Sequence, residues 1–146
     1  MQTRTTIRSD YNWCGKHILL IDSDKINYRL HRIYFEQTNS IIHCIANFEE
    51  ASHLFNTLTI DIILLEMHML NKKWKDLLKM ANSKFNIPII IQTTQHNDLE
   101  LIKNLEFPFK NIFSKPINWT LYLESIDSNL KLANTMLISK QLEFNN

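Results

Sequence analysis

Five short runs rich in isoleucine recur along the chain and constrain its fold more than any other feature. The runs occupy residues 17–21, 41–45, 60–65, 87–91 and 111–113. β-Branched residues favour strands, and bounded apolar runs of this length are more typical of strands than of helices. Three of the runs show no polar alternation, which is typical of strands buried on both faces of a parallel sheet. We therefore predict five parallel strands.

Amphipathic stretches separate these runs. Their apolar residues recur every three or four positions, which is the period of one face of an α-helix. The stripes are Ile26, Leu30 and Ile33; Ala51, Leu54, Phe55 and Leu58; Trp74, Leu77, Leu78 and Ala81; Leu99, Ile102 and Leu105; and Trp119, Leu123, Ile126, Leu130, Ala133 and Leu137. We expect the stripes to face the core. Alternating strands and helices predict an α/β fold, a three-layer (βα)5 doubly wound sandwich around a parallel five-stranded sheet.

The pattern predicts one domain with an extension at each end. No internal repeat, low-complexity tract or linker divides the 146 residues. The expected parts are an N-terminal arm, the domain and a C-terminal helical extension, at residues 1–15, 16–130 and 131–146. The last stripe continues past the expected edge of the sheet, where Ala133, Met136 and Leu137 have no core to enter. We expect a homodimer through this helix, with a frayed tail as the alternative.

Composition narrows the classes of function. Basic and acidic residues number 16 and 15 and are mixed along the chain, so no basic face for a nucleic acid is expected. No apolar run approaches the roughly 20 residues of a membrane span, and no signal peptide is evident, so we expect a cytoplasmic protein without membrane contact. Gly15 is the single glycine, which excludes glycine-rich phosphate loops. Cys14 and Cys44 are too few for a disulfide framework or a metal site.

Polar side chains follow four of the predicted strands, at the end where open parallel sheets bind ligands. They are Asp22-Ser23-Asp24, Glu66-Met67-His68, Gln92-Thr93-Thr94 and Ser114-Lys115-Pro116. Carboxylates gathered there could hold Mg²⁺, and a lysine with a hydroxyl could bind the oxygens of a phosphoryl group. A single acid at a strand end is more often a helix cap, and Asp22 or Asp24 could cap the next helix. Their joint placement at four strand ends predicts a functional site.

Several of these segments resemble the receiver domains of response regulators, and in particular those of hybrid sensor histidine kinases. The matching segments are residues 15–22, 25–28, 61–69, 87–93 and 113–117. The most specific element is Lys115-Pro116, because a lysine followed by a cis proline shapes the site in this family. The resemblance extends from Lys16 to about Leu130. It implies a flavodoxin-like receiver fold and a role in two-component phosphorelay signalling.

The resemblance also implies roles for individual residues. Receivers accept a phosphoryl group from a histidine kinase onto an aspartate that ends the third strand. Mg²⁺ is held by that aspartate, by an acid after the first strand and by a backbone carbonyl two residues beyond the acceptor. In this chain Asp22 matches the first acid, Thr93 the switch hydroxyl, and Lys115 with Pro116 the lysine and its proline.

The chain departs from the family at the two positions that matter most. Ser23 stands where the acid that binds the metal directly should be, and Glu66 stands at the phosphoacceptor. Elsewhere, Phe48, Trp74 and Pro108 stand where the family has glycines, and Leu70 stands where it has a proline. Ile112 stands at the position of the family's switch aromatic. Losing the carboxylate at position 23 weakens cation binding. The extra methylene of Glu66 displaces the acceptor by roughly 1 Å, and such an error costs about 10²-fold in rate.

We therefore expect at most a weak Mg²⁺ site, formed by Asp22, Glu66 and the backbone of His68, and otherwise no cofactor. Asp24 could substitute as a ligand, but its position in the family faces solvent. We expect Lys115 to lie within reach of Glu66, because a buried ammonium needs an anion. Glu66 then either only neutralises Lys115 or mimics the phosphorylated state.

These features predict a receiver domain that is not an enzyme and acts as a phosphorylation-independent interaction module. The expected partner is a protein, either a sensor histidine kinase or another signalling protein. Two alternatives remain open at this point. One is a receiver that still accepts phosphate, at Glu66. The other is an unrelated small-molecule-binding domain with a flavodoxin-like fold.

Overall fold

A computed structural model describes residues 10–94 and 99–144, with side chains described for residues 10–94, 100 and 102–133. Its centre is a parallel five-stranded sheet in the order β2-β1-β3-β4-β5. The strands are β1 (His17–Ile21), β2 (Ile41–Ile45), β3 (Ile62–Glu66), β4 (Ile89–Thr93) and β5 (Asn111–Ser114). The predicted α/β fold with five parallel strands is confirmed.

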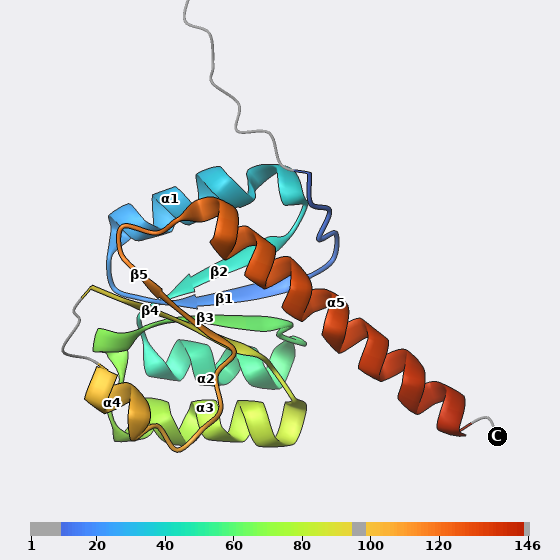
Figure 1. The fold of residues 1–146 in the computed structure, drawn as a ribbon. Helices are drawn as coiled ribbons and strands as arrows, with labels where there is room; N and C mark the ends of the chain where they lie inside the picture. Colours follow the sequence, from blue (N-terminus) through green and yellow to red (C-terminus); the bar gives the residue numbers. More distant parts are fainter. Residues whose placement is uncertain (1–9, 95–98, 145–146) are drawn as a thin grey trace, which may run out of the picture.

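Helices cover both faces of this sheet (Figure 1). They are α1 (Lys25–Phe35), α2 (Phe48–Thr57), α3 (Lys72–Phe85), α4 (Leu99–Lys103) and α5 (Trp119–Phe144), with short 3-10 turns at Glu36–Thr38 and Met67–Met69. Helices α1 and α5 lie on one face, and α2 and α3 lie on the other. The arrangement is the expected three-layer, doubly wound sandwich.

The core consists of two apolar layers separated by the sheet. On β1, Ile18 and Leu20 pack toward α1 and α5, whereas Leu19 and Ile21 pack toward α2 and α3. All five residues of β3 are buried, as expected for a central parallel strand. This alternation places the functional groups at the strand ends, because the strands themselves are filled with apolar side chains.

The outward face of α1 corrects one prediction. The exposed fractions of Ile26, Leu30 and Ile33 are 69%, 39% and 49%, so this stripe does not face the core. The buried face of the helix carries Asn27, His31 and Phe35 instead. Two of these three residues are polar, and their burial is tolerated because both have hydrogen-bond partners inside the protein. Hydrophobic periodicity located the helix correctly but assigned the wrong face to the core.

The segment before β1 is packed rather than extended. Trp13 is 3% exposed, and its indole Nε1 donates to Oδ1 of Asp127 on α5 at 2.9 Å. Its backbone N–H donates to the carbonyl of Thr38 at 2.6 Å. Part of the expected N-terminal arm therefore joins the 3-10 turn that follows α1 to α5.

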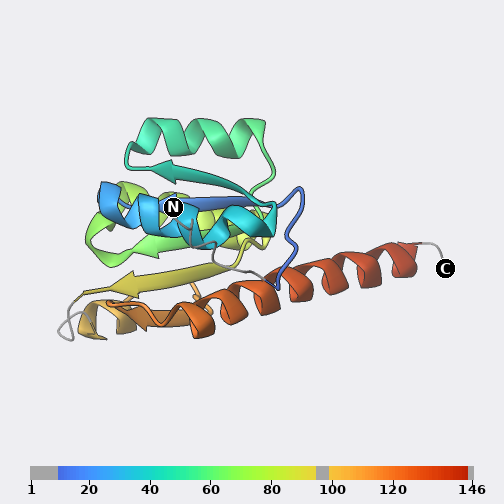
Figure 2. The same ribbon diagram turned by 90° about the horizontal axis from the view of Figure 1, so that it is seen from above.

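Helix α5 is one continuous helix of 26 residues that extends past the edge of the sheet (Figures 1 and 2). Its first half packs on the sheet through the fully buried Tyr122 and Ile126 and through Leu130. Leu132, near the point where the helix leaves the body, is 51% exposed. Within the described residues, no helix is both long enough and apolar enough to span a bilayer.

Candidate functional site

Four strand ends bring charged and polar groups together at one edge of the sheet. Asp22 follows β1, Glu66 ends β3, Thr93 ends β4, and Lys115 follows β5. Asp22, Glu66 and Thr93 are buried, with 2%, 4% and 5% of their surfaces exposed. Lys115 Nζ lies 2.6 Å from Glu66 Oε2 and 3.6 Å from Asp22 Oδ2. The predicted contact between Lys115 and Glu66 is confirmed, and the ammonium bridges two carboxylates.

The backbone positions Lys115 for this contact. The Lys115–Pro116 peptide bond is cis, as the family resemblance implied. The N–H of Lys115 donates to the carbonyl of Thr93 at 2.8 Å, which ties the end of β5 to the end of β4. The side chain then extends across the strand ends toward Glu66.

The two carboxylates of the Asp22-Ser23-Asp24 loop have different roles. Asp22 is the pocket acid: its Oδ1 accepts from the Asp24 N–H at 3.0 Å, and its Oδ2 accepts from Asn27 Nδ2 at 2.6 Å. Asp24 is exposed and is the N-cap of α1, where its side chain accepts from the Ile26 N–H at 2.9 Å. Ser23 is exposed. Asp24 is thus engaged outside the pocket, and it does not replace the acid missing at position 23.

Glu66 is held from two sides. Its Oε1 lies 2.8 Å from Nδ1 of His68, a side chain that is half exposed. Its Oε2 is buried and contacts Lys115 as an ion pair outside hydrogen-bond geometry. Desolvating this carboxylate is costly, and the nearby ammonium offsets that cost. Sequence reasoning considered only the backbone of His68, so the contact from its imidazole is a new element of the site.

The donor set bears directly on Mg²⁺. This cation takes oxygen ligands at about 2.1 Å in octahedral geometry and is commonly held by carboxylates. Here Asp22 and Glu66 already face an amide, an imidazole and the ammonium of Lys115. No group of three or more His, Cys, Asp or Glu side chains is arranged to hold a metal ion anywhere in the part of the chain described. In this arrangement the residues do not fit Mg²⁺.

A buried hydrogen-bond network extends from the pocket toward α5. The side chain of Gln92 on β4 is fully buried, and its Oε1 accepts from Asn27 Nδ2 at 3.0 Å. Its Nε2 lies 3.0 Å from Nε2 of His31 and also donates to the hydroxyl of Tyr122. The Tyr122 hydroxyl lies 2.9 Å from the same ring nitrogen of His31. The network therefore connects Asp22, through Asn27 and Gln92, to both α1 and α5.

The partners of His31 determine its protonation. Nδ1 lies 2.8 Å from the Asn27 carbonyl, which can only accept, so Nδ1 carries the proton. Nε2 must then accept from its neighbours, and the ring is neutral. Burial lowers the pKa of His31 to about 4. Burial also raises the pKa of Tyr122 well above its usual value, so the His31–Tyr122 pair is uncharged near neutral pH.

Sequence reasoning named Gln92 only as a residue at a strand end and assigned no functional role to His31. The contacts among Gln92, His31 and Tyr122 join positions 30 to 91 residues apart, and periodicity does not reveal such contacts. One signal was available: Asn27 and His31 stand four residues apart on one helix face.

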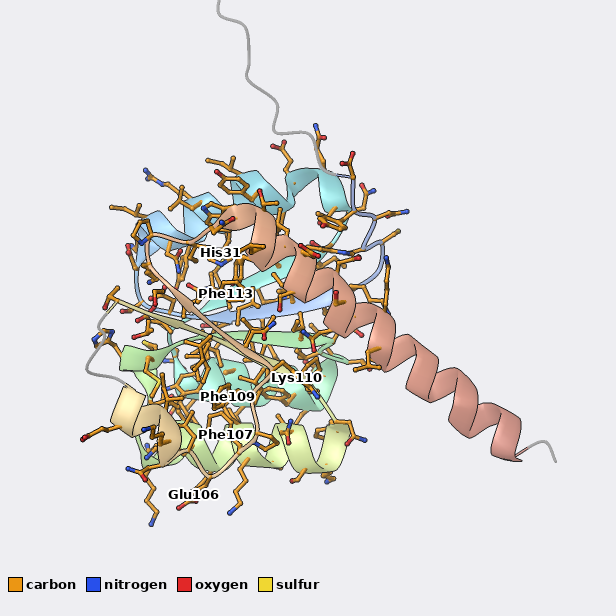
Figure 3. The ribbon with its side chains drawn as sticks, viewed as in Figure 1. His31, Glu106, Phe107, Phe109, Lys110 and Phe113 are labelled. Carbon is orange, nitrogen blue, oxygen red and sulfur yellow. The ribbon has the colours of Figure 1, made fainter. Side chains whose placement is uncertain are left out.

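At position 112, where the family resemblance implies a switch aromatic, the chain has an isoleucine. Ile112 is half buried and packs in the layer formed with α2 and α3. The neighbouring Phe113 points to the opposite face, where its ring lies 5.2 Å from that of Tyr122. His31 contacts the same tyrosine edge-on, with ring centroids 5.5 Å apart. His31 and Phe113 are both labelled in Figure 3. The ring contacts of Phe113 and His31 with Tyr122 are therefore on the side of α5.

Comparisons with known proteins agree with this architecture. The model of the response regulator receiver domain family matches residues 18–127. A signal receiver domain of an HD domain-containing protein from Pseudomonas fluorescens Pf-5 is 19% identical, with a TM-score of 0.71, covering 82% of this chain and 98% of that one. A two-component response regulator from Clostridium difficile is 24% identical, with a TM-score of 0.70 and coverage of 82% and 99%.

A third solved structure is similar to the same extent. The CheY-like response regulator receiver domain protein from Methanospirillum hungatei JF-1 is 18% identical, with a TM-score of 0.69, covering 83% of this chain and 98% of that one. At these identities the solved structures establish the fold alone. Because the family model matches more than half of the chain, the protein belongs to the response regulator receiver domain family.

Proposed function

We propose that this receiver domain is a protein-interaction module of two-component signalling whose state is not set by phosphorylation of its own pocket. The observation that carries the proposal is the position of Lys115, 2.6 Å from the carboxylate at the acceptor position and 3.6 Å from Asp22. An incoming phosphoryl group would have to displace an ion pair that is already formed. We place the module in the cytoplasm, without catalytic turnover and without a bound metal.

The charge balance of the pocket supports this proposal. Transfer to a carboxylate needs cationic groups that neutralise the phosphoryl oxygens as charge develops. Lys115 is already neutralised by Glu66, and Ser23 supplies no charge to attract Mg²⁺. Glu66 itself is longer than aspartate and is fixed by His68. The neutralised lysine, the uncharged serine and the fixed glutamate all disfavour phosphoryl transfer to this pocket.

A phosphodonor experiment tests the proposal. The chain is incubated with acetyl phosphate and Mg²⁺, and its intact mass is measured. We expect no phosphoryl adduct on the natural sequence. The variant Ser23→Asp with Glu66→Asp restores both acids and serves as the positive control. An adduct on the natural chain that disappears in Glu66→Gln would show instead that Glu66 is a working acceptor.

The outward face of α1 supports the interaction part of the proposal. Ile26, Leu30 and Ile33 form an exposed apolar stripe, and such stripes on soluble proteins commonly mark interaction sites. The exposed cations beside it are Lys25, Arg29 and Arg32, and α1 contains no acidic residue. This combination complements an amphipathic helix with acidic flanks. We assign that helix to a sensor histidine kinase.

A further inference from the structure

We propose that Gln92 is a positioning residue that couples the charged pocket to helices α1 and α5 through the buried network. The inference concerns how the site could be regulated, and its biological use rests on the proposed interface on α1. The coupling itself can be measured without any partner, so either proposal can fail without the other.

The pocket and the network meet at one atom. Oδ2 of Asp22 lies 3.6 Å from the Lys115 ammonium and accepts from Asn27 Nδ2 at 2.6 Å. Lys115 is at present drawn toward Glu66, at 2.6 Å. A loss of charge at Glu66 would release Lys115 toward Asp22, where it would compete with Asn27 for the same oxygen. A charge change in the pocket is thereby converted into a change of hydrogen bonding on α1.

Asn27 cannot move alone, because its amide also holds Gln92. The two N–H groups of Asn27 Nδ2 are used by Asp22 Oδ2 and by Gln92 Oε1. The other end of the Gln92 amide donates to Tyr122 and faces Nε2 of His31. The Asn27 and Gln92 side chains depend on each other for their hydrogen bonds. Displacing Asn27 therefore leaves buried polar groups unsatisfied unless Gln92 moves as well.

The packing of α1 makes the network relevant to its outward face. The buried residues of α1 are Asn27, His31 and Phe35, and the first two contact Gln92 on β4 through hydrogen bonds that fix the helix to the sheet. Leu30 and Ile33 lie on the solvent side of the same turns. A rearrangement of the hydrogen-bond network would change the position of these apolar side chains. It would also reach Tyr122, and hence α5.

This chain lacks the aromatic side chain that the family resemblance places at the switch position. Its absence strengthens the assignment of the coupling role to Gln92. The residue at the family's switch aromatic position is Ile112, which packs on the face of α2 and α3. Gln92 is instead a fully buried polar residue next to Thr93, and its amide contacts α1 and α5 at once. His31 also joins Asn27 to Tyr122, but it does so through the backbone carbonyl of Asn27, whereas Gln92 contacts the side-chain amide of Asn27 that faces Asp22.

Nuclear magnetic resonance of the full chain with labelled tyrosine rings tests the coupling. Tyr122 is assigned by its loss in Tyr122→Phe. Asp22→Asn removes one pocket charge with little change in shape, and we expect it to shift the Tyr122 signal. In a Gln92→Met background, which keeps the side-chain volume and removes the amide, the same shift should fall by at least about threefold, consistent with a loss of coupling between networked residues.

Two comparisons make the outcome decisive. Asp61→Asn alters a carboxylate that accepts from the His17 N–H at the opposite end of β1, and it should leave Tyr122 unshifted. A shift of equal size with and without Gln92 would show that only the electric field of Asp22 reaches Tyr122, and it would overturn the proposal. So would the absence of a shift in the parent. If Gln92→Met does not fold, Asn27→Leu interrupts the same network one step nearer the pocket.

Discussion

At the scale of single residues, the extra methylene of Glu66 and the missing carboxylate at position 23 alter the pocket together. The longer side chain places a carboxylate 2.6 Å from Lys115, while Ser23 is exposed and uncharged. Lys115 is thus held by the protein's own carboxylates, those of Glu66 and Asp22. Either change alone would weaken phosphotransfer, and the missing carboxylate at position 23 reduces the charge available to bind Mg²⁺.

His31 provides a prediction about pH. Its pKa is about 4 in the folded protein, against 6.5 for an ordinary histidine. As the pH falls below 6.5 the unfolded chain takes up the proton first, so stability is complete above 6.5 and is lost progressively toward pH 4. The loss should be on the order of 3 kcal/mol. Urea unfolding between pH 7.5 and 4 measures it.

A matched pair of variants separates His31 from the other histidines. His31→Gln cannot titrate and should flatten the pH dependence, although the half-buried His43, whose pKa burial also lowers, will retain a part of it. His53→Gln, at an exposed position on α2, should keep the parent's slope. An unchanged slope in His31→Gln would mean that folding does not lower the pKa of His31.

At the scale of elements, the strands followed from the sequence more closely than the helix faces did. Runs of isoleucine located β1 and β2 to the residue, because a buried parallel strand needs apolar side chains on both faces. The strand ends then placed Asp22, Glu66 and Lys115 together by topology alone. The face of α1 was predicted wrongly because the buried polar side chains of Asn27 and His31 are stabilised by partners distant in sequence.

The exposed stripe on α1 leads to a prediction about stability and binding. Leu30→Gln with Ile33→Gln should change the free energy of unfolding by no more than about 0.5 kcal/mol per site, as for other surface positions. Leu78→Ala, in the fully buried part of α3, should cost about 2–5 kcal/mol. Chemical denaturation compares them. A cost at Leu30 and Ile33 close to that of Leu78 would contradict their outward placement.

The same double variant tests the interface. Binding of the chain to the purified cytoplasmic domains of sensor histidine kinases is measured by biolayer interferometry. We expect Leu30→Gln with Ile33→Gln to weaken binding at least tenfold, about 1.4 kcal/mol. Leu121→Gln removes a similarly exposed leucine from α5 and should leave the affinity unchanged. Equal effects of the two variants would exclude α1 as the specific contact.

At the scale of the whole molecule, the projecting half of α5 leads to a prediction about assembly. The helix continues to Phe144, beyond the sheet, and its sequence keeps an apolar residue every three or four positions through Leu137. The side chains of Met136 and Leu137 lie outside the described residues, so their pairing with a second copy stays a proposal. We expect a homodimer through this segment.

Sedimentation of a truncated chain tests the dimer. A cut after Lys131 keeps Leu130, which is 4% exposed and part of the core. The full chain should sediment as a dimer and the truncated chain as a folded monomer. If both are monomers at micromolar concentration, the projecting helix is not an interface between copies.

The central claim is that the pocket is closed by its own ion pair and has no place for a phosphoryl group with its cation. Mg²⁺ titration with and without beryllium fluoride, followed by the backbone amide resonances of residues 22–24, 66–68 and 93, tests it most directly. We expect no saturable shift up to about 10 mM Mg²⁺ for the natural chain, and saturation in Ser23→Asp with Glu66→Asp, because ligand charge sets the affinity of such sites. Saturable binding by the natural chain, tightened by beryllium fluoride, would contradict the account.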